Sequence, residues 1–164
     1  MISNIIRTIT VFFAFVCALA GCRQTVDVHF DPSVADYTPV VREILENHPE
    51  GNITLRFGKG VYPFYPEKAP EEFLNVSNND SGNKRVAFLL KNMKNVRIAG
   101  DETDFMFHGS MTPFAVKGSE NVEISGISID YDYPWTFEGT VLSNDPVNRS
   151  FVVKVFSDSK YRIV

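Results

Sequence analysis

Hydrophobic and polar residues alternate through the middle of the chain, and one stretch of the alternation occurs twice. The segments Asn95–Gly100 and Asn121–Gly126 both read Asn-Val-x-Ile-x-Gly, at an offset of 26 residues (121 − 95). Upstream, Phe88–Lys91 aligns with Phe114–Lys117 at the same offset. A period of roughly 20 to 50 residues is typical of solenoid proteins, and β-branched residues alternating with polar ones are typical of strands. The pattern therefore predicts stacked strands.

The same alternation assigns the faces of each predicted strand. Val96 and Ile98 share one face, and Val122 and Ile124 occupy the equivalent positions one period later. If successive strands stack at the usual spacing of roughly 4.8 Å, each aliphatic side chain lies over its equivalent. We therefore expect an all-β fold, a parallel β-helix with aliphatic ladders in its core. Two unrelated hairpin strands are the alternative.

A helix is predicted before the first strands. Thr38 fits the N-cap and Pro39 the first helical position, and Pro49 and Gly51 end the segment after about three turns. The apolar stripe of this helix consists of Val40, Val41, Ile44 and Leu45. A stack of strands exposes an apolar cross-section at its end, so we expect this amphipathic helix to cover it.

The remaining segments alternate with turns. Ile53–Phe57 and Gly58–Tyr62 read as a strand, a glycine corner and a second strand. Tyr65–Arg85 is polar and rich in proline, asparagine and serine, which predicts a projecting loop. Phe137–Leu142 and Phe151–Phe156 flank turn residues and predict an antiparallel hairpin that leaves the stack.

Composition narrows the classes of partner. The chain has 164 residues, of which 44% are hydrophobic and 13% aromatic, enough for one domain but not for two of ordinary size. The formal net charge is −4, and no cluster of lysine or arginine occurs. These features disfavour nucleic acid and anionic membrane surfaces as partners and leave a neutral ligand such as a sugar open.

The first 21 residues read as an export signal. Arg7 is the only charge before an apolar run that is too short to span a bilayer. The run ends in Leu19-Ala20-Gly21-Cys22, which resembles the lipobox of bacterial lipoproteins. We expect cleavage before Cys22, a lipid anchor on its thiol, a tether over residues 22–35 and a location at the membrane of the bacterial cell envelope. An ordinary secretory signal peptide that is cut nearby is the alternative.

Neither cysteine is expected to do chemistry. Cys17 lies in the segment that would be removed, and Cys22 would carry lipid. No thiol would then remain for a disulfide, a metal or catalysis.

Carboxylates and aromatic rings interleave in Ile127–Trp135. Asp130 would face outward, and Asp132 would join it at roughly 6.6 Å if the strand persisted. This lies near the roughly 6.5–9.5 Å expected of the two carboxyl groups in an inverting glycosidase. Any i, i+2 pair on a strand has this separation, however, so we assign no catalytic residue. Tyr133 and Trp135 present rings that stack on sugars. The candidate substrate-binding residues are Asp130, Asp132, Tyr133 and Trp135, and ordinary packing is the alternative.

His108 stands without a second ligand at metal spacing, so we interpret it as a turn or surface residue.

Taken together, the stretch from about Asp31 to Arg162 resembles the N-terminal part of glycoside hydrolase family 110, the bacterial α-1,3-galactosidases. The resemblance rests on four segments: Val40–Leu45, Ile53–Tyr62, the two Asn-Val-x-Ile-x-Gly copies, and Ile129–Trp135. It implies a right-handed parallel β-helix with inserted β-barrel domains. It also implies removal of terminal α-1,3-linked galactose, as in blood group B glycans, with inversion and without a metal cofactor.

The chain is much shorter than members of this family and lacks the later coils on which their catalytic carboxylates lie. The resemblance therefore implies a truncated and inactive member: a capping helix and first coils over residues 36–136, then the start of an incomplete insert over residues 137–164. The expected partner is a galactose-containing glycan, and the oligomeric state stays open. One alternative is a surface glycan-binding lipoprotein without catalysis. Another is a reading frame cut by a frameshift, whose correction would restore an intact hydrolase.

Overall fold

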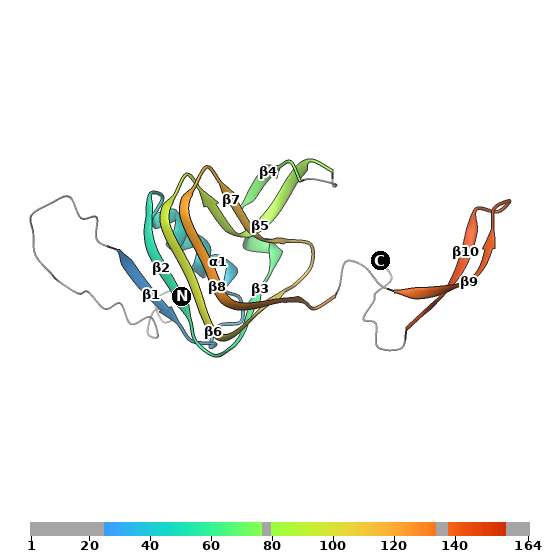
Figure 1. Ribbon diagram of the computed structural model, residues 1–164, viewed down its shortest axis with the longest axis horizontal. Helices are drawn as coiled ribbons and strands as arrows, with labels where there is room; N and C mark the ends of the chain where they lie inside the picture. Colours follow the sequence, from blue (N-terminus) through green and yellow to red (C-terminus); the bar gives the residue numbers. More distant parts are fainter. Residues whose placement is uncertain (1–24, 77–79, 134–137, 157–164) are drawn as a thin grey trace, which may run out of the picture. The chain divides into compact units, whose positions relative to one another are not determined.

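The computed structural model describes residues 25–76, 80–133 and 138–156, and its elements are labelled in Figure 1. The described residues form ten β-strands, one α-helix and one 3₁₀ turn, so the expectation of an all-β fold is confirmed at the level of fold class. The chain divides after Asp130 into two compact units. Within the described residues, no helix is long and apolar enough to cross a bilayer. The predicted signal segment, Cys22 and Trp135 lie outside the described residues.

One five-stranded sheet organises the first unit. Its strands run parallel in the order β1, β2, β6, with β8 paired to the far side of β6. β6 is long enough to pair with β2 through its first half and with β3 through its second half. The strands of this sheet are β1 (Val26–Phe30), β2 (Gly51–Phe57), β3 (Gly60–Phe64), β6 (Lys94–Phe107) and β8 (Glu120–Tyr131).

Aliphatic residues form columns through this sheet. Val28, Leu55 and Ile98 are register partners from one strand to the next, and all three are buried. Ile53 and Val96 form a second, equally buried column. Full burial of one such side chain contributes about 1.5–3 kcal/mol, so these columns are a main source of stability.

Aromatic rings fill the space between this sheet and a second pair of parallel strands. β5 (Gly82–Lys91) pairs with β7 (Thr112–Lys117), and Phe88 lies opposite Phe114 in that register. Phe88 stacks on Phe105 of β6, with ring centroids 5.4 Å apart. Phe64 of β3 stacks on Phe107 at 5.1 Å. The aromatic core therefore lies between the five-stranded sheet and the β5–β7 pair.

Contacts between β6 and β8 occur at the offset of 26 residues that the sequence predicts. The Nδ2 of Asn121 donates to the Oδ1 of Asn95 at 2.6 Å. Ion pairs join Lys94 to Glu120 at 2.9 Å and Arg97 to Glu123 at 3.3 Å. Glu123 and its partner Arg97 are both about half exposed, so alternation turns the flanking Val122 and Ile124 toward the opposite, inner side.

A row of asparagines connects three layers of the stack. The row consists of Asn52, Asn95 and Asn121, which lie near the starts of β2, β6 and β8. Each of them adopts a positive φ between 53° and 56°. Asparagine tolerates this left-handed conformation better than other residues that carry a side chain. The Nδ2 of Asn95 donates to the Oδ1 of Asn52 at 2.9 Å, as Asn121 does to Asn95. We call these three residues the asparagine ladder.

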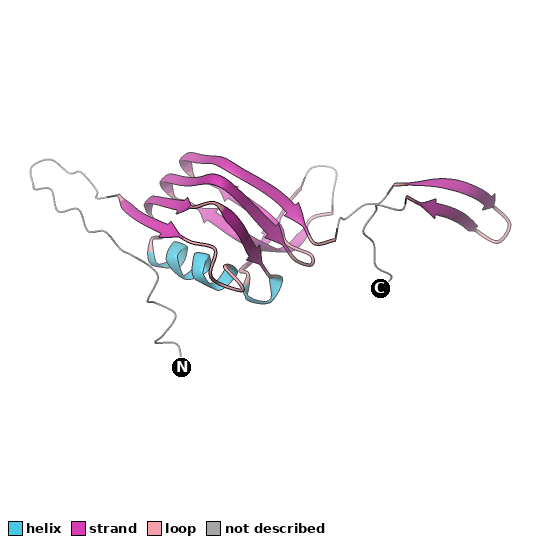
Figure 2. Cartoon of the chain, turned by 90° about the horizontal axis from the view of Figure 1, so that it is seen from below, coloured by secondary structure: helices cyan, strands magenta, loops and turns pink. Residues whose placement is uncertain are grey.

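The helix α1 (Thr38–Asn47) has the predicted extent and lies at the end of the stack opposite β8, as Figure 2 shows. Within the helix, the side chains of Val41 and Leu45 are buried. The N-cap prediction was wrong, because Thr38 is the first helical residue and caps nothing with its side chain. Its backbone N–H donates to Asp36 Oδ1, and its hydroxyl accepts from the N–H of Tyr65, both at 2.9 Å. The threonine side chain thus anchors a later strand end.

Two segments are more regular than expected. The stretch predicted as a tether contains β1, because Val28 and Phe30 extend the buried columns of the sheet. The predicted loop over residues 65–85 contains η2 (Pro66–Lys68) and β4 (Glu71–Leu74), which pairs antiparallel with β5. An ion pair between Glu71 and Arg85 at 3.0 Å stabilises this pairing.

The second unit contains the predicted hairpin, which is confirmed. β9 (Gly139–Asp145) pairs antiparallel with β10 (Ser150–Val155). Asp145 closes the turn by accepting the backbone N–H groups of Val147 and Asn148 at 3.0 and 3.1 Å. Hydrogen bonds from the side chain and backbone of Asn148 lower the pKa of Asp145.

Candidate functional site

Three of the predicted sugar-contacting residues follow closely along the chain at the end of β8. Asp130 lies exposed on the strand, and Asp132 and Tyr133 follow in a bend. Because β8 ends at Tyr131, the strand geometry assumed for an Asp130–Asp132 pair does not extend to Asp132. The backbone N–H of Tyr133 donates to Asp132 Oδ1 at 2.8 Å. Trp135 lies outside the described residues.

This end of β8 offers chemistry suited to a neutral sugar. The Tyr133 residue is 44% exposed, and Asp130 is exposed as well. An exposed ring can stack on the apolar face of a sugar while carboxylates accept its hydroxyl groups. Asp130, Asp132 and Tyr133 also have interactions within the protein, so they are held in place rather than unpartnered.

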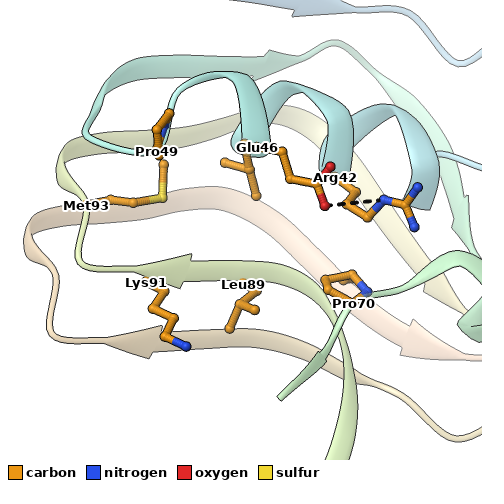
Figure 3. Close-up of a pocket in the computed structure, with 9 residues that line it drawn as sticks. Arg42, Glu46, Pro49, Pro70, Leu89, Lys91 and Met93 are labelled. Carbon is orange, nitrogen blue, oxygen red and sulfur yellow. Dashed lines mark ion pairs between the residues drawn. The ribbon is translucent and has the colours of Figure 1, made fainter.

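A pocket lies elsewhere, between α1 and β5 (Figure 3). Its volume is about 170 Å³, below the roughly 300–1,000 Å³ of most ligand sites. None of the predicted sugar-contacting residues lines it. The residues lining it are Arg42, Leu45, Glu46, Pro49, Pro70, Ala87, Leu89, Lys91 and Met93.

The charged groups of this pocket are already engaged. Glu46 is its one carboxylate, and its Oε1 lies 3.6 Å from the Nε of Arg42. Another guanidinium nitrogen of Arg42 donates to the carbonyl of Lys68 at 2.8 Å. An acid and a base positioned across a sugar are therefore not found in this pocket. Sequence reasoning missed it because it depends on α1 meeting β5.

A second charge cluster joins β4 to the β5–β7 pair. Glu72 accepts from Lys117 Nζ at 2.6 Å and from Lys91 Nζ at 3.1 Å. These hydrogen bonds, that of Lys117 first, lower the pKa of Glu72. Because Lys91 and Lys117 are register partners, one carboxylate holds two adjacent layers together.

Histidine chemistry finds no support in the geometry. The ring of His108 stacks flat on Tyr65 with centroids 4.1 Å apart, immediately after β6. Across the described ranges, no group of three or more histidine, cysteine, aspartate or glutamate residues is arranged to hold a metal ion.

Comparison with known proteins identifies relatives for most of the chain. α-1,3-Galactosidase A of Shewanella woodyi is 34% identical over 131 residues, which is 78% of this chain and 21% of that protein. α-1,3-Galactosidase B of Parabacteroides distasonis is 33% identical over 144 residues, 87% of this chain and 23% of that protein. α-1,3-Galactosidase B of Akkermansia muciniphila is 37% identical over 97 residues, 58% of this chain and 12% of that protein. No protein-family model matches the chain.

The chain thus spans less than a quarter of the length of these relatives. Within that span, the identity is 33–37%. The predicted resemblance of this chain to the α-1,3-galactosidases of glycoside hydrolase family 110 is confirmed.

Proposed function

We propose that this chain forms consecutive turns of a right-handed parallel β-helix of the α-1,3-galactosidase type. Three sets of parallel pairs support the proposal: β1–β2–β6, β3–β6 and β5–β7. The chain visits these sets in a fixed order, which is how a solenoid winds. The asparagine ladder gives further support, since it repeats one corner in three layers.

The proposed ligand is a glycan that ends in α-1,3-linked galactose, such as a blood group B structure. The names of the relatives carry this substrate class, and the exposed end of β8 supplies the matching chemistry. Asp130 and Asp132 would accept sugar hydroxyls, while Tyr133 and Trp135 would stack on the ring.

The family activity is hydrolysis with inversion, and we propose that this chain alone does not perform it. Inversion needs one carboxylic acid and one carboxylate on opposite sides of the scissile bond. Asp130 and Asp132 are two residues apart on one chain segment, whereas Glu46 and Glu72 are engaged by basic side chains. The second candidate is therefore a glycan-binding lipoprotein without catalysis, which the exposed Tyr133 favours.

One experiment separates these candidates. The full chain is assayed for release of galactose from B trisaccharide and, in parallel, titrated with the same sugar. Binding without turnover, weakened by Trp135→Ala, supports the binding protein. Phe73→Ala is the matched control, because Phe73 is a 56% exposed aromatic residue on β4. Turnover above a no-enzyme blank would refute the inactive assignment, and neither binding nor turnover would leave a scaffold without a sugar site.

The proposed location is the bacterial cell envelope, with the chain anchored by lipid on Cys22. Expression with globomycin, or of the Cys22→Ser variant, should leave unprocessed precursor on a gel. The matched control is Cys17→Ser, which should mature normally, since that cysteine lies within the proposed signal segment. Normal maturation of the Cys22→Ser chain would exclude the anchor.

A further inference from the structure

The pocket between α1 and β5 is lined mainly by apolar side chains, several of which are buried. Leu45, Ala87 and Met93 are the buried ones. Every lining residue falls within residues 42–93, at the end of the stack that α1 covers. The pocket is therefore complete without β7, β8 or the residues that follow them. Its apolar lining residues are Leu45, Pro49, Pro70, Ala87, Leu89 and Met93.

The volume of this pocket limits a ligand to a small molecule. At about 170 Å³ it is close in size to an engineered apolar cavity of roughly 150 Å³ that binds benzene. A body of about six carbons would therefore fill it. Filling it would remove apolar surface of both the ligand and the lining from water, which favours binding.

Arg42 supplies an anchor for a negative charge at this pocket. Its Nη1 donates to the carbonyl of Lys68 at 2.8 Å, which holds the guanidinium in place. Its Nε is buried and, within the described part of the chain, has no hydrogen-bond partner. The Oε1 of Glu46 lies 3.6 Å from this nitrogen, which is beyond hydrogen-bond distance (Figure 3). A buried donor without an acceptor is costly, so an oxygen that approached it closely would be stabilised.

The other charged groups near the pocket leave Arg42 as the preferred anchor. Lys91 also lines the pocket, but its Nζ binds Glu72 at 3.1 Å, and Glu72 binds Lys117 at 2.6 Å. The Glu46 side chain is 66% exposed, so it can turn away from Arg42 at little cost. These three basic and two acidic groups carry a net charge of +1 (3 − 2), which one carboxylate would neutralise.

We propose that the pocket between α1 and β5 binds a small monocarboxylic acid with an apolar body of about six carbons, whose carboxylate pairs with Arg42 in place of Glu46. The apolar body of the ligand lies against Leu89 and Met93. Glu46 occupies the position of the anion while the pocket is empty and gives way when the acid binds. This site is separate from the sugar-binding candidates and does not rest on the proposed glycan function.

Benzoate is the probe, because it joins a six-carbon ring to one carboxylate. The full chain is prepared with isotope-labelled methionine methyl groups, and benzoate is titrated while the methyl resonances are followed by NMR. The Met93 methyl group should shift and saturate with a Kd of about 0.1–10 mM, as expected of so small a ligand. Met111 is buried as well but does not line the pocket, so its resonance is the internal control. The Met93→Leu variant assigns the Met93 signal.

Benzyl alcohol tests the charge of the ligand, because it keeps the ring and lacks the carboxylate. It should bind about tenfold more weakly than benzoate, the loss expected when a hydrogen bond to a charged group is removed. Arg42→Gln should weaken benzoate binding by about the same factor. Arg56→Gln is the matched control, because the Arg56 side chain is 42% exposed against 40% for Arg42 and pairs with Asp27 outside the pocket.

Two further variants test the exchange of carboxylates and the position of the ring. Glu46→Gln should strengthen benzoate binding about 1.5-fold to fivefold, because it removes the competing carboxylate. Glu43→Gln, on the exposed side of α1, is its matched control. Leu89→Phe fills the pocket and should abolish binding without changing any charge. Circular dichroism confirms that each variant is folded.

Each part of the proposal can be overturned separately. Equal affinity for benzoate and benzyl alcohol, or unchanged affinity in Arg42→Gln, would refute the pairing with Arg42. Unchanged affinity in Leu89→Phe, or equal shifts at Met93 and Met111, would place benzoate outside the pocket. Weaker binding in Glu46→Gln would show that Glu46 supports the ligand instead of giving way to it. Absence of a saturable Met93 shift at concentrations well above the expected Kd would overturn the site altogether.

Discussion

β6 and β8 carry the same six-residue pattern, yet the two strands differ in what they bury. Ile98 has a layer on each side and is fully buried, while Ile124 has one neighbouring layer among the described residues and is 39% exposed. The polar contacts nevertheless match, since asparagine pairs with asparagine and lysine or arginine with glutamate. Sequence pattern therefore determines register and facing, whereas burial depends on how many layers flank the strand.

The sharpest way to break this comparison is to truncate the equivalent isoleucines. Ile98→Ala should lower the free energy of unfolding by about 2–5 kcal/mol, because it leaves a cavity between two layers. Ile124→Ala should cost less than about 2 kcal/mol, because its side chain is partly in water already. Urea titrations of both variants measure the difference, with Val147→Ala as an exposed control. Equal costs at the two positions would contradict the distinction between inner and edge layers.

The glycine corner tests whether the two layers are held at backbone distance. A Cβ on Gly100 would collide with the carbonyl oxygen of Gly126 and with the side chain of Thr103. Gly100→Ala should therefore destabilise the protein by about 1–3 kcal/mol, as overpacking does. Gly82→Ala is the control, because a Cβ there meets open space. A Gly100→Ala chain that melts at the parent temperature in calorimetry would show that the layers separate without cost.

The titration of Tyr62 tests how well the inner layer excludes water. Burial first, and then the nearby Tyr37 and Asp31, raise the pKa of Tyr62 from 10.0 to about 12. The folded pKa of Tyr62 exceeds the unfolded one. The stability that the protonated Tyr62 contributes is therefore fully present below about pH 10 and is lost as the pH rises through about 12. The Tyr62 hydroxyl donates to the buried carbonyl of Phe30 at 2.9 Å.

Tyr62→Phe should cost about 1 kcal/mol at neutral pH through this hydrogen bond. The variant should also lose less stability than the parent between pH 10 and 12, measured by denaturant unfolding. A parallel fall of both proteins across that window would show that Tyr62 titrates as it does in the unfolded chain.

The smallest expected effect concerns the carboxylate that joins adjacent layers. Lys117 and Lys91 lower the pKa of Glu72, so its stabilising contribution is present above the unfolded value and is lost as the pH falls through the folded one. Glu72→Gln should lower the melting temperature at pH 7 and make a smaller difference at pH 3. Glu43→Gln serves as the exposed control, and an offset for Glu72→Gln that is the same at both pH values would argue against the ion pairs.

Local pattern was enough to predict part of this structure. The contact of Asn95 with Asn121, the extent of α1 and the β9–β10 hairpin all follow from residues close together in sequence or from an obvious echo. The contact of Asn52 with Asn95 does not, because it spans 43 residues and Phe57 replaces the glycine of the pattern. β1 was missed because its short alternation becomes a strand only when β2 lies beside it.

The candidate site was less accessible to sequence reasoning. Its residue types could be recognised, because Asp130, Asp132 and Tyr133 stand together in the chain. Their arrangement could not, because the point at which β8 ends decides whether Asp132 lies on the strand. The pocket beside α1 depends on packing between elements about 40 residues apart and has no local signature.

The inserted β4 strand has a consequence for engineering. The corner after Phe64 takes the 21 residues 65–85, whereas the equivalent corner after Phe107 takes the four residues 108–111. This difference of 17 (21 − 4) equals the difference between the 43- and 26-residue spacings of the asparagine contacts. The extra chain is thus absorbed laterally, and the neighbouring layers keep their alignment. Foreign epitopes or recognition loops inserted at this corner should therefore be exposed without changing the register of the neighbouring strands.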